Sequence, residues 1–266
     1  MNFLKKQIVL IHESENESYI DYAQNLMKGT DFEIISASPD INRYEAVVFV
    51  FEKEPHNNCK KLNEWVGHSH LRTVWGKSEN EKMQMLKKVL LHIAGIPVPL
   101  EIERKYLIKY PDIRFLEGME NCKGVGIEQI YLSPIEGKHI RIRKRTALGK
   151  DMYIKTEKKK ISSTVRIETE EEIREKQYSD FAQHIDKDTL PIVKTRYCLA
   201  YSGYYFEIDI FPFWSDKAYL EIELTDENEA FELPLFVEVI KEVTEDKRYT
   251  NRSLAKLLKE GKTAEI

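Results

Sequence analysis

The sequence contains few cysteines, and their spacing does not match that of a structural site. Cys59, Cys122 and Cys198 lie far apart among 266 residues and match neither a zinc-binding pattern nor a disulfide framework. Isolated cysteines of this kind are typical of proteins in a reducing compartment. We therefore expect three reduced, partly buried thiols and a cytoplasmic protein.

Long hydrophobic runs are absent as well. Lys5 and Lys6 precede the apolar stretch QIVLI, residues 7–11, near the N-terminus. Five apolar residues are too few for the core of a signal peptide or for a membrane span. We expect a soluble chain with no membrane partner.

The sequence also lacks an excess of positive charge. Its 41 basic and 45 acidic residues give a formal net charge of −4, whereas nucleic acid-binding proteins are usually basic, so we expect no nucleic acid partner. Charged residues still make up 32% of the chain, which raises the question of whether the two signs are segregated in space. The 42% apolar fraction, with 14 Tyr and 11 Phe, suffices for the core of one large or two modest domains.

Residues 1–96 have the pattern of a small α/β domain. Short apolar runs alternate with stretches whose apolar residues recur at helical spacing, and this alternation is typical of parallel strand pairing. The predicted strands cover 7–11, 32–37 and 45–51, and the predicted helices cover 18–29 and 80–95. The stretch GIPVPL, residues 95–100, breaks the pattern with two prolines and is the predicted linker.

Residues 97–266 have a different texture, with runs that alternate apolar and polar residues. Such alternation predicts antiparallel strands at 99–109, 125–132, 138–146, 151–158, 162–169, 190–200, 203–211 and 218–225. Helical spacing predicts helices at 170–186, 227–243 and 252–260. Eight strands are enough to close a sheet on itself. We therefore predict an α+β chain in which an eight-stranded antiparallel barrel with flanking helices follows the small α/β domain.

Charged side chains recur on one face of most of these predicted strands. For any single strand, a solvated outer face explains the alternation. The recurrence over most of the strands, with basic and acidic strands grouped, instead favours charges that point into the lumen of a closed sheet. The residues concerned are Glu101, Glu103 and Lys105; Arg141, Arg143 and Arg145; Lys155; Arg166, Glu168 and Glu170; Lys194 and Arg196; Glu207 and Asp209; and Glu221 and Glu223.

A lumen lined by both signs of charge predicts a particular kind of ligand. Removing a charged side chain from water costs about several kcal/mol. A bound polyanion together with its metal ions offsets this cost. Lysine and arginine side chains suit phosphate oxygens, while carboxylates would repel the anion unless a divalent cation lay between them. Mg²⁺ and Mn²⁺ prefer oxygen ligands. The pattern therefore indicates a site for a metal ion and a polyphosphate.

Two histidines in the first region are weaker candidates for a site. His68 and His70 lie in a polar loop without a third ligand, so we expect solvated side chains instead of a metal site. Trp65 and Trp75 nearby are expected to pack within the small domain.

Motifs in the second region occur in the order found in a known family. The stretches are EIERK at 101–105, EQIYL at 128–132, RIR at 141–143, RIETE at 166–170 and EVTEDKRYTNRSLA at 242–255. Together they resemble the CYTH superfamily, the triphosphate tunnel metalloenzymes that include class IV adenylyl cyclases and thiamine triphosphatases. The resemblance covers nearly all of the C-terminal region and implies an eight-stranded antiparallel tunnel that binds a triphosphate.

The resemblance also implies roles for individual residues. The implied phosphate-binding residues are Lys105, Arg141, Arg143, Lys155, Arg166, Lys194 and Arg196. The implied ligands for Mg²⁺ or Mn²⁺ are Glu101, Glu103, Glu168, Asp209, Glu221 and Glu223. The residues expected to be indispensable for catalysis are Glu101, Glu103, Lys105, Lys194 and Glu223.

The N-terminal region resembles the P-loop kinase-like domain that precedes the tunnel in some CYTH proteins. The junction MLKKVLLHIAGIPVPLEIERKYLI carries this likeness, but HESENES follows QIVLI and no GxxxxGK[ST] motif occurs. A domain of this kind would lack its phosphate cradle. We expect a degenerate module with a structural role or an interaction role, the latter as a homodimer contact or a site for a protein partner.

Three hypotheses for function follow. The leading one is a metal-dependent triphosphatase, a phosphoric anhydride hydrolase that acts on inorganic triphosphate or a small organic triphosphate with Mg²⁺ or Mn²⁺. The first alternative is a class IV-type adenylyl cyclase that makes cyclic AMP from ATP with the same metal and phosphate residues. The second is a nucleotide- or polyphosphate-binding protein without catalysis.

Overall fold

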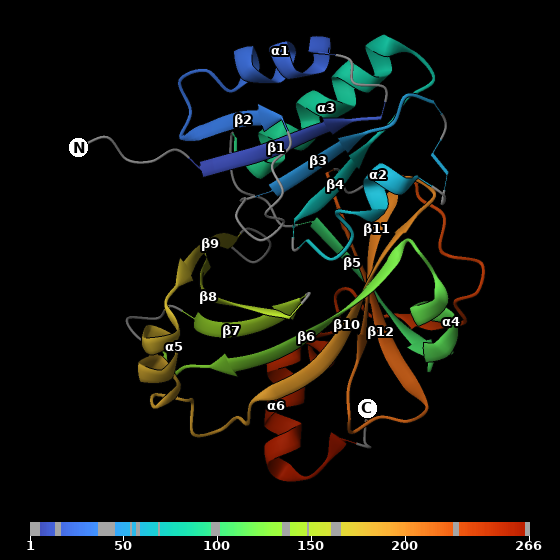
Figure 1. Cartoon of the computed structure of the whole chain (residues 1–266). Coiled ribbons are helices and arrows are strands. Elements are labelled where there is room, and N and C mark those ends of the chain that lie inside the picture. The colour runs from blue at the N-terminus through green and yellow to red at the C-terminus, as the bar shows by residue number, and fades with distance from the viewer. Residues whose placement is uncertain are drawn as a thin grey trace.

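Two β-sheets organise the chain in the computed structural model, a small parallel sheet near the N-terminus and a large antiparallel sheet after it (Figure 1). The structure describes residues 6–13, 17–36, 46–53, 55–56, 59–68, 70–96, 102–134, 139–147, 149–160, 166–225 and 229–263. The side chains of residues 139, 158–160 and 166–169 are outside this description.

The small sheet has four parallel strands in the order β2-β1-β3-β4. Its strands are β1 (Lys6–His12), β2 (Phe32–Ser36), β3 (Ala46–Val50) and β4 (Leu71–Val74). Its helices are α1 (Glu17–Leu26), the short α2 (Lys60–Asn63) and α3 (Glu79–Ile93). The predicted parallel pairing, three strands and two helices of this region are confirmed, whereas β4 and α2 were not predicted because their apolar runs are short.

The small sheet buries both of its faces. One face packs against apolar residues of α1 and α3, among them Ala23 and Leu86. The other face, with Val47 and Phe49, packs against α2 and against residues of the large sheet. Buried runs such as AVVFV in β3 are typical of a parallel strand that is covered on both sides.

The large sheet has nine strands in the order β13-β5-β12-β11-β10-β6-β7-β8-β9, and every neighbouring pair is antiparallel. The first five along the chain are β5 (Ile102–Lys109), β6 (Cys122–Tyr131), β7 (His139–Ala147), β8 (Lys150–Lys160) and β9 (Arg166–Ile173). The others are β10 (Ile192–Tyr201), β11 (Tyr204–Ile210), β12 (Lys217–Leu224) and β13 (Val239–Glu242). The helices are α4 (Ile113–Gly118), α5 (Glu175–Ala182), the 3₁₀ turn η1 (Lys247–Tyr249) and α6 (Asn251–Glu260).

Each of the eight predicted strands has a counterpart in this sheet, but the count and the helices need correction. A ninth strand, β13, lies in the stretch 227–243 that was predicted as a helix, and no helix occurs among the described residues of that stretch. The predicted helix at 170–186 is shorter, because β9 continues to Ile173 and α5 covers only Glu175–Ala182. Among the described residues, the edge strands β13 and β9 do not pair with each other.

The large sheet has one face that is charged in the middle and apolar at both ends. We call it the inner face and define it by Lys194, Arg196 and the residues that register with them. At one end, Val125, Cys198 and Tyr205 join the apolar cluster beneath the small sheet. The opposite end of the inner face is covered by α6. Figure 1 shows the small sheet and α6 at opposite ends of the large sheet. The apolar residues at that end are Leu107, Tyr131, Ile192, Phe211 and Tyr219.

The outer face of the large sheet carries two apolar clusters. Leu116 of α4 packs against Phe206, Ile208 and their neighbours, and Tyr178 of α5 packs against Ile142 and its neighbours. All three cysteines are free and buried, whereas partial burial was predicted. Within the described residues, no helix has the length and apolar character needed to cross a membrane.

The turn between β10 and β11 fixes the small sheet to the large one. Ser202 and Gly203 both have positive φ, 47° and 79°, as a two-residue hairpin turn requires. The hydroxyl of Thr73 in β4 donates a hydrogen bond to the carbonyl of Gly203. A Cβ atom at Gly203 would lie only 2.6 Å from Cγ of Pro55 and 3.0 Å from Trp75. The hairpin tip therefore fits closely against the small domain.

We predict that Gly203→Ala lowers the free energy of unfolding more than Gly149→Ala does. Both glycines have a positive φ, 79° and 73°, but a Cβ at Gly149 would meet nothing within 4 Å. The left-handed conformation should cost either variant about 1 kcal/mol, and overpacking against Pro55 should add about 1–3 kcal/mol in Gly203→Ala. Urea denaturation of both variants measures the difference, and equal losses would mean that the hairpin tip is not tightly packed.

Candidate functional site

A belt of charged side chains crosses the middle of the inner face, between its two apolar ends. On β11, Glu207 and Asp209 lie between Tyr205 at one end and Phe211 at the other. Residues directly opposite on neighbouring strands share a face, so the register identifies the other members. The belt consists of Glu103, Lys105, Arg141, Arg143, Arg145, Glu170, Lys194, Arg196, Glu207, Asp209, Glu221 and Glu223.

Arg196 links the carboxylates of two strands. Its Nε and Nη2 donate to the two oxygens of Asp209 at 2.6 and 2.7 Å, and Nη2 also donates to Glu221 at 2.7 Å. Nη1 donates to Glu207. Asp209 is fully buried, and Arg196 keeps its pKa below the ordinary value although burial alone would raise it. One guanidinium therefore contacts three carboxylates on two strands.

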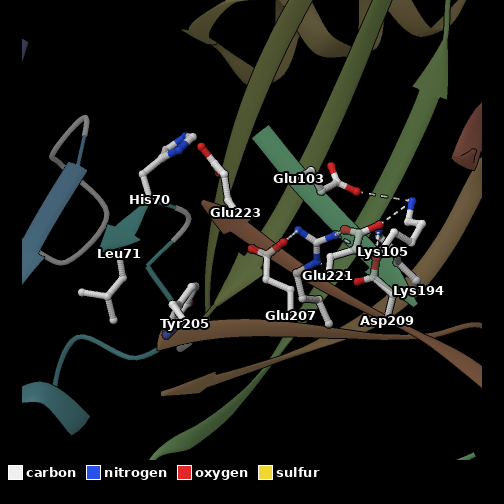
Figure 2. Close-up of polar contacts among 12 residues, drawn as sticks. His70, Leu71, Glu103, Lys105, Lys194, Tyr205, Glu207, Asp209, Glu221 and Glu223 are labelled. Carbon is white, nitrogen blue, oxygen red and sulfur yellow. Dashed lines mark hydrogen bonds and ion pairs between the residues drawn. The ribbon is translucent and has the colours of Figure 1, made fainter. Parts of the chain in front are cut away.

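Two lysines complete this network (Figure 2). Lys105 Nζ lies 2.6 Å from Glu221 and 3.7 Å from Glu103, and these carboxylates raise its pKa against the effect of burial. Lys194 Nζ donates to Asp209. Burial and the neighbouring charge of Arg196 lower the pKa of Lys194 to about 8, so it still carries its proton at neutral pH. The acidic half of the belt is thus neutralised from within.

The arginines of β7 differ from Arg196 in their partners. Arg143 Nε and Arg145 Nη2 are buried and have no hydrogen-bond partner among the described residues. Arg145 is only 3% exposed. Burial and the charge of Arg141 lower the pKa of Arg143, which shows that no nearby carboxylate compensates its charge fully. Buried donors without acceptors cost about 1–3 kcal/mol each, so they favour the binding of an anion with several oxygens.

Glu170 joins the belt to the small domain. Its carboxylate accepts from the hydroxyl of Thr156 at 2.7 Å and lies 3.4 Å from Arg141 Nη2. His70 Nε2, from the residue that precedes β4, lies 3.4 Å from the other carboxylate oxygen. This hydrogen bond raises the pKa of His70, although burial acts in the opposite direction.

Glu223 is also in contact with the small domain. Arg72 of β4 donates to one of its oxygens, and Nε2 of His92 in α3 lies 3.3 Å from the other. Arg72 and His92 hold the pKa of Glu223 well below its usual range, although burial alone would raise it. Two residues of the small domain therefore contact both oxygens of a carboxylate that the sequence predicts to be a metal ligand.

The structure brings together most of the predicted site residues that it describes. Glu103, Lys105, Arg141, Arg143, Lys194, Arg196, Asp209, Glu221 and Glu223 all lie on the inner face. Glu101 and the side chains of Arg166 and Glu168 are outside the described part of the chain.

Two predicted residues are placed differently. Lys155 registers with Ile142 on the outer face, where it contacts Glu157, Glu171 and the ring of Phe181. Asp209 lies on the inner face, but Arg196 and Lys194 occupy both of its oxygens. The arrangement thus separates Lys155 from the phosphate-binding candidates and makes Asp209 an anchor for cations.

Several belt contacts escaped the site prediction. Arg145, Glu170 and Glu207 were recognised on charged strand faces but were given no role. His70 was expected to be solvated and instead contacts Glu170, and His68 is buried. Their signal in the sequence was weak, because both contacts depend on how the small domain packs against the large sheet.

The carboxylates of the belt offer the oxygen donors that a divalent ion prefers. Glu103 and Glu223 register directly opposite each other, and each side chain is 36% exposed, more than Glu221 at 9%. Oxygen donors of this kind suit Mg²⁺ or Mn²⁺. Among the described residues, however, no three acidic, histidine or cysteine side chains already converge as a metal site. An ion at Glu103 and Glu223 would therefore have to replace the cations that hold them.

Comparison with known proteins gives structural neighbours only. No protein-family model and no curated protein matches the sequence. Two structures of the protein NE1496, one of them described as an inorganic triphosphatase, are 30% and 29% identical to this chain. They align with 59% of this chain and with 97% and 94% of their own lengths, at TM-scores of 0.41 and 0.39. A third structure is of an adenylyl cyclase-like protein from Hippeastrum, described as having a dominant triphosphatase activity. It is 13% identical to this chain, aligns with 47% of this chain and with 80% of its own length, and has a TM-score of 0.30.

We predict that Arg196→Met strongly destabilises the fold. The substitution would leave three carboxylates on adjacent strands without the cation that they share, and breaking a buried ion network from one side costs about 3–5 kcal/mol. Arg248→Met is the matched control, because Arg248 pairs with Asp246 and is 75% exposed. That variant should lose less than about 1 kcal/mol. Urea denaturation at pH 7 compares the two, and a similar small loss in both would show that Arg196 does not hold the belt together.

Proposed function

We propose that this chain, which belongs to the CYTH superfamily, is a divalent-metal-dependent triphosphatase. Its membership follows from the motifs at residues 101–105, 128–132, 141–143 and 242–255 and from 30% sequence identity to a relative of which the chain covers 97%. The proposed substrate is inorganic triphosphate or a small organic triphosphate.

The observation that carries the proposal is the imbalance within the belt. Glu207, Asp209 and Glu221 are satisfied by Lys105, Lys194 and Arg196. In contrast, Arg143 and Arg145 retain buried N–H groups without acceptors among the described residues. A chain of phosphates carries many anionic oxygens and would supply those acceptors. Arginine is suited to such contacts because its planar fork binds two oxygens at once.

The proposal assigns a role to each group of residues. Arg141, Arg143 and Arg145 bind phosphate oxygens from one side, and Lys105, Lys194 and Arg196 approach from the other. Glu103, Glu221 and Glu223 would hold the divalent ion, which supplies charge neutralisation and orients the reactants when it is bound. The acidic residues thus stay next to an anion without repelling it.

Hydrolysis then needs little covalent participation by the protein. The oxygen of a water molecule attacks the terminal phosphorus, the bond from that phosphorus to the bridging oxygen breaks, and the products are orthophosphate and the shortened diphosphate. Negative charge spreads over the equatorial oxygens of the transferred group in the transition state. Fixed, buried guanidinium groups stabilise this charge without having to reorganise.

The test of this function is product analysis with a panel of triphosphates. The wild-type chain with Mg²⁺ or Mn²⁺ should release orthophosphate from inorganic triphosphate or an organic triphosphate, and a chelator should abolish the release. Cyclic AMP and pyrophosphate from ATP would instead identify an adenylyl cyclase. Tight binding without turnover of any triphosphate would identify a binding protein.

We predict that Arg143→Met weakens triphosphate binding about tenfold or more without lowering stability. Removal of one charge-assisted hydrogen bond to a phosphate oxygen should weaken binding by about that factor. Because the substitution removes a buried charge that has no ion-pair partner among the described residues, it should leave the free energy of unfolding unchanged or raise it. Calorimetry with inorganic triphosphate and urea denaturation measure the two quantities.

The matched control is the neighbouring Lys144→Met. Lys144 lies on the other face of β7 and pairs with Asp151. This variant should bind triphosphate like the wild type. Equal binding by both variants would contradict the proposed phosphate contact of Arg143.

A further inference from the structure

The small domain reaches the charged belt with three side chains that the proposed function does not use. His70 directly precedes β4, Arg72 lies in β4, and His92 lies near the end of α3. They contact Glu170 and Glu223, which lie on β9 and β12 of the large sheet. Figure 2 shows His70 and Glu223 close to the network of Glu103, Glu207 and Lys105.

The packing on either side of β4 holds these residues in place. The Tyr205 hydroxyl donates to the carbonyl of His68 at 2.9 Å and accepts from the amide of Gly67 at 3.2 Å. After Arg72, the Thr73 hydroxyl donates to the Gly203 carbonyl, and Leu71 lies in the apolar cluster shared by the two sheets. Side chains at an anchored strand are held more rigidly than side chains on a loop, which suits a role in ligand binding.

Arg72 has a carboxylate as its acceptor, and a phosphate would be a second kind of acceptor for its guanidinium. It donates to Glu223 from the edge strand of the small sheet, and its side chain is 11% exposed. Because His92 takes the other carboxylate oxygen, both oxygens of Glu223 are occupied by the small domain. A divalent ion at Glu223 would compete with a guanidinium and an imidazole, and the displaced guanidinium would need another anion.

The same strand connects to the phosphate-binding candidates on β7. His70 contacts Glu170, which in turn lies 3.4 Å from Arg141 Nη2. Arg72 follows His70 by two residues. A triphosphate held by Arg141 and Arg143 would therefore lie beside β4, where Arg72 carries the one guanidinium among the described residues of the small domain.

We propose that Arg72 is a further phosphate-binding residue of this site, supplied by the small domain and held by Glu223 while no triphosphate is bound. The inference rests on the proposed triphosphate site. It makes the small domain a working part of that site, because the domain contributes a cation that contacts the substrate. Substrate and Glu223 compete for the guanidinium of Arg72.

The first test measures binding without turnover. Calorimetry with inorganic triphosphate, in the presence of a chelator, should show about tenfold weaker binding to Arg72→Met than to the wild type, as expected for one charge-assisted contact. Titration with Mn²⁺ alone should show no loss of affinity in this variant, because Glu223 loses a competing cation. The control Lys77→Met, an exposed lysine of the same domain, should match the wild type in both titrations.

A second variant separates ligand binding from a purely structural role. Glu223→Gln releases Arg72 from its ion pair, so metal-free triphosphate should bind several times more tightly, and the gain should disappear in the double variant with Arg72→Met. Glu223→Gln also removes a carboxylate that repels the anion, so a structural role for Arg72 predicts that any gain persists in the double variant. That result, or wild-type triphosphate affinity in folded Arg72→Met, would overturn the inference. If Arg143→Met weakens binding while Arg72→Met does not, only this inference fails; if the wild type binds no triphosphate, the proposed function fails as well.

Discussion

The large sheet depends on one buried guanidinium. Glu207 and Glu221 register directly opposite each other on neighbouring strands, an arrangement that like charges normally disfavour. Arg196 contacts both of them together with Asp209, so that three carboxylates share one cation. A planar guanidinium with several donors in fixed directions suits this arrangement better than a lysine ammonium, which is a compact charge on a flexible stem. The pairing of β11 with β12 on their charged side therefore requires Arg196.

This internal neutralisation explains why the two halves of the belt differ. A further cation binds the compensated carboxylates only by replacing one that already holds them. The carboxylates near Arg143, in contrast, do not fully compensate its charge. Arg143 and Arg145 keep N–H groups without acceptors among the described residues, although burial penalises such groups. Proteins retain uncompensated buried charges mainly where a ligand compensates them, which makes β7 the more informative half of the site.

The sequence allowed most of the belt to be predicted, because side chains in a strand alternate with a period of two residues. That rule grouped Arg141 with Arg143 and Lys194 with Arg196 correctly. It could not say which face of one strand meets which face of the next, since this depends on register. Lys155 shows the consequence: β8 pairs so that Ile154 lies opposite Arg143, and Lys155 falls on the outer face. The stretch 227–243 was assigned to a helix from its spacing of apolar residues, yet β13 there pairs with β5, a tertiary contact that overrides local pattern.

The contacts between the small domain and the belt could not be predicted from the sequence, for a different reason. Arg72 and Glu223 are separated by 151 positions (223 − 72), and neither lies in a pattern that indicates the other. Their meeting follows from the apolar cluster shared by the two sheets, in which Val47 and Phe49 of β3 pack together with Val125 and Cys198. Had the small domain been a separate module on a linker, its surface would have been polar where it instead buries these residues. A domain that shares its core with the inner face cannot move away without exposing that core. Its charged side chains therefore contribute to the electrostatic environment of the belt.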